Sequence, residues 1–207
     1  LGIGIDRVAR ELEEHFPRLR LFKLDSDSVR GGSVPGATIK RFLSTPGSVL
    51  LGTELALYYL KERIENVAIV ALDSLFALPD YRINERVFGL LIRLRALTTK
   101  QFIIQTRNVR VRLFDQALKG NLLDFYRTEI AERKQYGYPP FQTFIKVALS
   151  GERAQVRLAM KTLADQLASY EPEVFPAFIP VISGEYRLHL LIKRRPNDWP
   201  EPALLEQ

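Results

Sequence analysis

An alternation of short apolar runs with helical patterns constrains the first half of this chain more than any other feature. The expected strands are 19–24, 48–51, 67–72 and 102–105. A helical pattern at 5–16 precedes them, and the patterns between them include 38–43 and 80–97. Strands that are buried on both faces are nearly continuous in apolar residues, and helices connect them when they run parallel. The pattern therefore predicts an α/β lobe with a parallel sheet over residues 1–108.

The pattern changes after residue 108. Two helices are expected over 109–118 and 121–135, and Gly137-Tyr138-Pro139-Pro140 then ends the second one. Beyond that stop, apolar and polar residues alternate as in half-buried strands, and the expected elements are strands at 141–150, 174–182 and 185–193 with a helix at 153–169. We therefore expect three parts: the lobe at 1–108, linking helices at 109–138, and a small α+β domain with antiparallel strands at 139–207.

Charge is the second informative feature. The chain has 207 residues, with 30 Lys and Arg against 24 Asp and Glu, and a net charge of +6. Much of the excess lies between Arg82 and Arg112, where Glu85 is the one acidic residue among many basic ones. A local basic patch is typical of a protein that binds a polyanion such as nucleic acid, although an Arg-rich solvated surface is the alternative.

Two groups of basic residues are candidates for DNA contact. On the helix from Asp80, the residues Arg82, Arg86 and Arg93 share one face; they either meet phosphates or, for the first two, bond to nearby carboxylates. On the strand 185–193, period-two alternation puts Arg187 and Lys193 with His189 on one side, which is either a nucleic-acid platform or a solvated face. The predicted DNA-binding residues are Arg93, Arg95, Lys100, Arg107, Arg110, Arg112, Arg187 and Lys193.

Several catalytic and metal chemistries have no candidate residues. The chain has no Cys and only two His, His15 and His189, which lie in different predicted domains, so a disulfide framework, a Cys-ligated zinc, a catalytic triad and a His-metal cluster are not expected. No phosphate-binding loop of the G-x-x-x-x-G-K-[ST] type occurs. No apolar run is long enough to span a bilayer. No residue is predicted to be catalytic, and no metal ligand is predicted.

The order of several segments resembles one protein family, the PriA (primosomal protein N-prime) helicases of bacterial replication restart. The most specific match is Gly137-Tyr138-Pro139-Pro140-Phe141 to the family pattern G-Y-P-P-F. The other matching segments are Gly2-Ile3-Gly4-Ile5-Asp6, Leu24-Asp25-Ser26-Asp27, Leu50-Leu51-Gly52-Thr53-Glu54, Leu78-Pro79-Asp80-Tyr81-Arg82, Ile104-Gln105-Thr106, Glu132-Arg133-Lys134 and Leu190-Leu191-Ile192-Lys193.

The resemblance implies an architecture and a set of partners. Residues 1–108 would be the second RecA-like helicase lobe, and residues 139–207 a C-terminal α+β domain that lacks its closing helix and strand. The first lobe, an N-terminal DNA-binding domain and a Cys-ligated zinc module would lie upstream, because the chain is expected to be a piece of a longer protein. Branched or single-stranded DNA, the single-strand DNA-binding protein and the proteins that load the replicative helicase would be partners, in the bacterial cytoplasm near the nucleoid.

The departures from the family pattern shape the functional expectation. The segments 60–65 and 91–100 lack the family's K-G-x-D-F-P and Q-V-A-G-R-A-G-R, and the latter supplies an Arg for phosphoryl transfer. We therefore expect a DNA-binding replication-restart protein that is not an enzyme, with its ATPase motifs lost, no cofactor in this chain and doubtful ATP binding. The alternatives are an active ATP-dependent 3'-5' helicase and an interaction scaffold that does not bind DNA.

Overall fold

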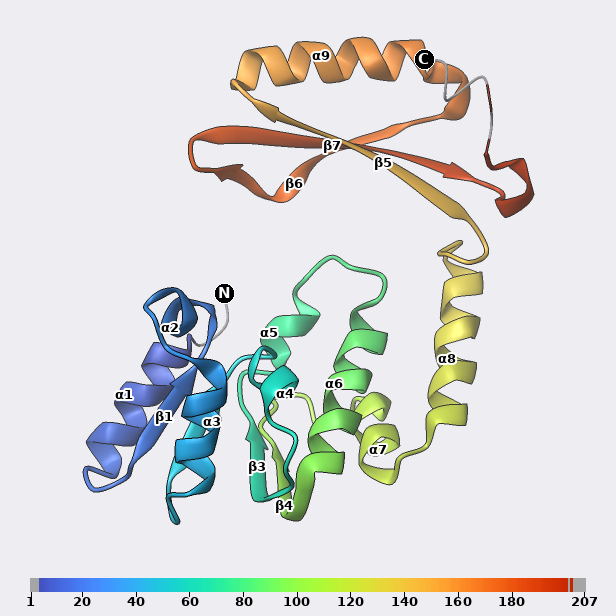
Figure 1. Cartoon of the computed structure of the whole chain (residues 1–207). Helices are drawn as coiled ribbons and strands as arrows, with labels where there is room; N and C mark the ends of the chain where they lie inside the picture. The colour runs from blue at the N-terminus through green and yellow to red at the C-terminus, as the bar shows by residue number, and fades with distance from the viewer. Residues whose placement is uncertain (1–3, 201, 203–207) are drawn as a thin grey trace. The chain divides into compact units, whose positions relative to one another are not determined.

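The computed structural model describes residues 4–200 and 202 and separates the chain into two compact units, Leu1–Asn121 and Leu122–Gln207 (Figure 1). The first unit holds α1 (Ile5–His15), β1 (Leu21–Leu24), α2 (Ser26–Arg30), α3 (Pro35–Leu43), β2 (Val49–Gly52), α4 (Ala56–Tyr59), β3 (Ile64–Ile69), α5 (Asp73–Phe76), α6 (Ile83–Leu97), β4 (Thr98–Ile104) and α7 (Arg112–Lys119). The second holds α8 (Leu122–Gln135), β5 (Thr143–Gly151), α9 (Arg153–Gln166), η1 (Ala168–Tyr170), β6 (Glu173–Ile182), β7 (Glu185–Arg194) and η2 (Pro196–Asp198). The three-part division with limits at 108 and 138 stays a prediction. The Gly2-Ile3 part of the first family segment lies outside the described residues.

The α/β character of the first unit is confirmed, but its strands do not form one sheet. β1 pairs in parallel with β2, and β3 pairs in parallel with β4, as two separate two-stranded sheets. Both strands of the first pair have only four residues. In β3 only Val67 is buried, so this strand is not enclosed on both faces as a central strand would be.

One apolar core connects these two strand pairs. Leu24 at the end of β1 is fully buried and clusters with Ile39, Ala56 and Leu60, and Ile64 of β3 packs against the same cluster. A close approach explains the glycine at the end of β2, since a Cβ on Gly52 would lie 2.5 Å from the Cβ of Ala56. Both strand pairs therefore belong to one folded unit.

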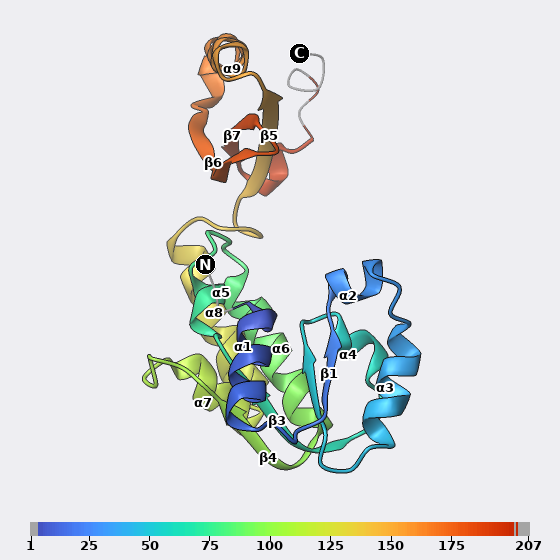
Figure 2. The same ribbon diagram turned by 90° about the vertical axis from the view of Figure 1, so that its left-hand side faces the viewer.

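The second unit is a three-stranded antiparallel sheet with one long helix on it. The strand order is β5-β7-β6, and α9 packs on one face (Figures 1 and 2). The core between them contains Val156 and Met160 of α9 and Leu188, Leu190 and Ile192 of β7. The buried positions of β7 alternate with less buried ones, so the predicted period-two pattern of this strand is confirmed.

No helix in the described part of the chain is long and apolar enough to cross a membrane.

Candidate nucleic-acid interface

The sheet of the second unit presents a face opposite α9, which we call the open face. Strand register assigns to it the residues that alternate with the core positions: Phe144, Lys146, Ala148 and Ser150 of β5, Arg187, His189, Leu191 and Lys193 of β7, and Glu173 and Phe175 of β6. Lys146, Ala148 and Ser150 are exposed, while the facing β7 residues Arg187 and His189 are half-buried. The predicted pair Arg187 and Lys193 thus shares this face with His189, as the sequence pattern requires.

The cations on the open face differ in their surroundings. The Lys193 ammonium donates to the Glu173 carboxylate at 2.6 Å, so its charge is neutralised. Within the described residues, no carboxylate lies at ion-pair distance from Lys146 or Arg187, and the Arg187 Nε is buried without a hydrogen-bond partner. Lys146 and Arg187 therefore provide an uncompensated positive charge on this face, which favours an anionic ligand.

The imidazole of His189 reports the same positive potential. Partial burial lowers its pKa below the ordinary value, and the nearby charges of Lys146 and Arg187 lower it further. The ring packs edge to face against Phe175, with centroids 5.7 Å apart. His189 is therefore neutral near pH 7 and offers a ring surface beside the two cations. Such combinations of stacking rings and cations are typical of single-strand binding surfaces.

The predicted basic residues of the first unit fall into two groups at opposite ends of β4. Arg93 and Arg95 lie in the last turns of α6, just before β4, and Lys100 lies near the start of that strand. Arg107, Arg110 and Arg112 follow its end, and all six residues are exposed. A strand of seven residues spans roughly 20 Å, so these side chains do not form one continuous patch.

The group after β4 lies at the edge where the carboxyl ends of parallel strands meet. The Asp73 carboxylate accepts hydrogen bonds from the Thr106 hydroxyl at 2.6 Å and the Arg107 backbone N–H at 2.8 Å, and these bonds lower the pKa of Asp73. The loop carrying Arg107 is thereby fixed to the segment after β3. Ligands of open parallel α/β sheets bind at this edge, so Arg107, Arg110 and Arg112 have a placement suited to a ligand.

Two arginines of the predicted helical row bond inside the unit instead. Arg86 donates to Glu54 at 2.8 Å, which connects α6 to the segment after β2, and Arg82 lies 3.9 Å from Asp80. The alternative of internal bonding is therefore confirmed for these two residues.

The group before β4 has partners of its own. The Arg93 guanidinium lies over the Tyr58 ring, 5.7 Å from its centroid, and Lys100 pairs with Glu65 at 2.6 Å. Arg95 and Lys100 line an open hollow of about 480 Å³ together with Arg63. This group therefore has less uncompensated charge than the sequence alone indicates.

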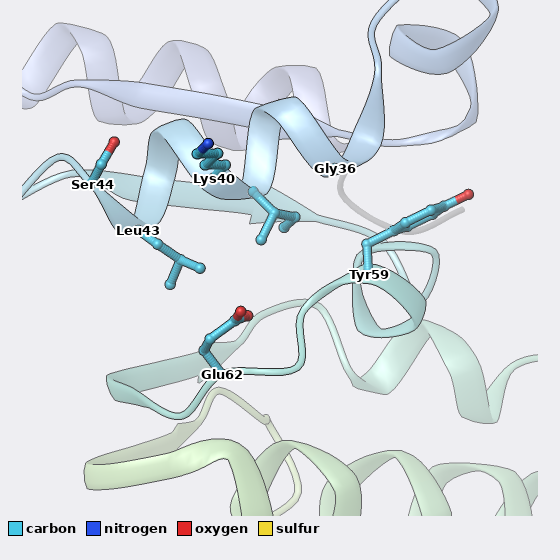
Figure 3. Close-up of a pocket in the computed structure, with 7 residues that line it drawn as sticks. Gly36, Lys40, Leu43, Ser44, Tyr59 and Glu62 are labelled. Atoms are coloured by element: carbon cyan, nitrogen blue, oxygen red, sulfur yellow. The ribbon is translucent and has the colours of Figure 1, made fainter.

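A second open hollow, of about 540 Å³, lies beside α3 and contains none of the predicted site residues. In Figure 3 the Glu62 carboxylate points from the loop after α4 toward α3, which contributes Leu43 and Lys40. Its lining combines apolar side chains with both charge signs, so it does not resemble an anion site.

Known relatives align with almost the entire chain. A replication restart protein PriA from Thermotoga maritima is 29% identical over 92% of the chain, one from Synechocystis is 31% identical over 93%, and one from Treponema pallidum is 29% identical over 93%. The chain belongs to the PriA family. It corresponds to a C-terminal part of PriA and spans about a quarter of the length of the first two relatives, 27% and 25% respectively. No protein-family profile matches the chain.

The expectation that this chain is not an enzyme is wrong. Matches to PriA, the helicase family, cover so much of the chain that they include the departing segments 60–65 and 91–100. These departures therefore do not separate the chain from that family. The error came from treating the sequence departures in these two segments as a loss of activity, although the chain spans only about a quarter of a PriA protein.

The resemblance places a Cys-ligated zinc module upstream of this chain, and the chain itself has no cysteine. The described residues also contain no group of three or more His, Asp or Glu side chains that could hold a metal.

Sequence reasoning did not include Lys146 and Phe175 in the candidate interface. The alternation of residues 141–150 placed Lys146 on the polar side of its strand. Its importance depends on the neighbouring strand β7, where Leu191 is the partner of Lys146. Arg187 lies four residues from Leu191 on the same face, with His189 between them. Only strand pairing, which sequence reasoning did not establish, brings the two cations to one face.

Proposed function

We propose that this chain is the C-terminal part of a PriA-type replication restart helicase and that it helps to hold branched DNA at stalled forks. The first unit would serve as the second RecA-like lobe, with Arg107, Arg110 and Arg112 at its ligand edge. The second unit would bind DNA through its open face. Partners of the longer protein would include the single-strand DNA-binding protein and the loaders of the replicative helicase, in the bacterial cytoplasm.

One observation supports the DNA-binding part of the proposal most strongly. Lys146 and Arg187 have no carboxylate partner within the described residues, and they flank the neutral ring of His189. Phosphate contacts by such cations give affinity without sequence specificity, and ring surfaces accept any base. If this face were only solvated, a half-buried arginine on it would be expected to have a carboxylate partner, and Arg187 has none within the described residues.

The test is the salt dependence of DNA binding by the full chain. Fluorescence anisotropy with forked DNA is measured across a range of salt concentrations for the wild type and for K146Q/R187Q. Each lost phosphate contact reduces the slope of log K against log salt by about 0.7 on single strands or about 0.9 on duplex. The matched control is K193Q, because Lys193 already pairs with Glu173. A slope that the double variant leaves unchanged would show that DNA binds elsewhere.

A further inference from the structure

β6 contains a bulge directly opposite Arg187. Pro176 is in register with Leu188 and Val181 with Tyr186, so four β6 residues, 177–180, lie opposite the single β7 residue Arg187. Figure 1 shows β6 bending away from β7 before the two strands meet again near the hairpin turn. Bulges of this kind redirect side chains out of the regular ladder.

The bulge exposes large apolar side chains. Phe178 is 61% exposed and Ile179 is 52% exposed, and the following Val181 is 55% exposed. Exposure of this apolar surface to water is unfavourable in free energy, and contact with a partner would remove it from water. The segment is therefore a candidate contact surface.

The sequence of this strand disfavours a partner that adds a further strand. Pro172, Pro176 and Pro180 lack backbone N–H groups, so the outer edge of β6 offers an interrupted ladder. A ligand of this segment must therefore bind to its side chains and not to its backbone. The cation beside the bulge, Arg187, with its buried and unpartnered Nε, makes the site complementary to an anion that also presents apolar surface. The end of a base-paired stem has this chemistry, since the base plane is apolar and the phosphates are charged.

We propose that Phe178 and Ile179 form a wedge that stacks on the exposed base plane at the branch point of forked DNA, while Arg187 and Lys146 hold the adjacent phosphates. The proposal rests on the DNA-binding function proposed above and adds the DNA feature that is recognised. Apolar side chains that contact unstacked bases are a recurrent device of proteins that bind distorted DNA.

The experiment uses the full chain and compares a fork with a duplex of the same length whose two ends are closed by hairpin loops, so that the duplex exposes no base plane. The variant F178S/I179S removes the wedge, and L158S is the matched control, because Leu158 on α9 is 69% exposed and lies outside the bulge. Equal thermal unfolding of all three proteins confirms that the substitutions do not disturb the fold. A 2-aminopurine base at the branch point reports stacking directly.

We expect F178S/I179S to lose about tenfold in affinity for the fork and to lose the 2-aminopurine response. Its duplex affinity and its salt slope should equal those of the wild type, because no phosphate contact is removed. A fork affinity equal to that of L158S overturns the wedge, even if K146Q/R187Q weakens binding. Loss of self-association with unchanged DNA affinity also overturns it, because the bulge would then contact a second copy of the chain. A wild-type chain that binds neither DNA refutes the DNA-binding function itself.

Discussion

At the scale of single residues, neutralisation distinguishes the cations of the open face. Lys193 and Lys146 are both exposed, but only Lys193 has a carboxylate within reach, that of Glu173. The sequence predicts which side of β7 carries charge because alternation is a local property. It does not predict the ion pair, since Glu173 is 20 residues away and reaches Lys193 only through strand pairing. A count of charges along the sequence therefore treats the two lysines as equal, although only Lys146 keeps an uncompensated charge.

His189 provides a pH-dependent prediction at this scale. Its folded-state pKa lies below the ordinary value of about 6.5, so the unfolded chain takes up this proton at a higher pH than the folded chain. The stability contributed by the neutral ring is present above about pH 6.5 and is lost as pH falls below it. Phosphates bound beside the ring would raise its pKa, so DNA affinity should increase as pH falls from about 7 to about 5.5.

The measurement is an NMR titration of the two histidine ring signals with and without forked DNA. His15, whose ring hydrogen-bonds the Glu11 carbonyl in α1, is an internal control and should not respond to DNA. A His189 pKa that DNA leaves unchanged would show that no phosphate lies near the open face.

At the scale of elements, short-range contacts fix the segments that resemble the family pattern. In α8, Glu129 is 6% exposed and accepts a hydrogen bond from the Arg133 Nε at 2.8 Å, while the Arg133 Nη1 donates to the Pro139 carbonyl at 3.4 Å. The same arginine thus connects the helix to the Gly-Tyr-Pro-Pro turn. This explains in physical terms why an Arg stands four residues before that turn.

The substitution R133A should destabilise the protein strongly. It leaves the buried Glu129 carboxylate without its charge partner, which typically costs about 3–5 kcal/mol. R127A is the matched control, because Arg127 pairs with Asp124 on an exposed part of the same helix, and such pairs contribute about 0–1 kcal/mol. Urea unfolding of both variants measures the difference. Equal losses would mean that the Glu129 pair is not the connection described above.

A second prediction at this scale concerns the edge of the β3–β4 pair. In D73N the side-chain amide would no longer offer two acceptors to Thr106 and to the Arg107 N–H. Hydrogen bonds to charged groups contribute about 1.5–3 kcal/mol, so exchange of the Arg107 amide hydrogen should accelerate about tenfold or more. Hydrogen-exchange mass spectrometry measures this, with the β7 amides as reference. Unchanged exchange at Arg107 would show that Asp73 does not hold this loop.

Most elements follow from local patterns, although the strand expected at 67–72 is shifted to Ile64–Ile69. The expected strands at 174–182 and 185–193 correspond to β6 and β7, and the expected helix at 121–135 corresponds to α8. The prediction of a single parallel sheet is wrong, because strand pairing depends on contacts between segments that periodicity does not describe. The short helices α2, α4 and α5 were also missed, since four or five residues show no helical period.

At the scale of the whole molecule, family membership and the open face support one account. The chain corresponds to a C-terminal part of PriA, and its second unit presents uncompensated cations and rings on a sheet face that α9 leaves open. The sequence identified the family through the order of its segments. The expectation that the chain is not an enzyme was wrong, because departures in the segments 60–65 and 91–100 do not separate the chain from the PriA family.

The position of DNA on the molecule tests this account most directly. Forked DNA is cross-linked to the full chain by ultraviolet light, and the linked peptides are identified by mass spectrometry. The account predicts cross-links on the open face, at Phe144, Phe175 or His189, and at the β6 bulge around Phe178. Cross-links confined to the solvent side of α9 or to α3, with none on β5, β6 or β7, would contradict it.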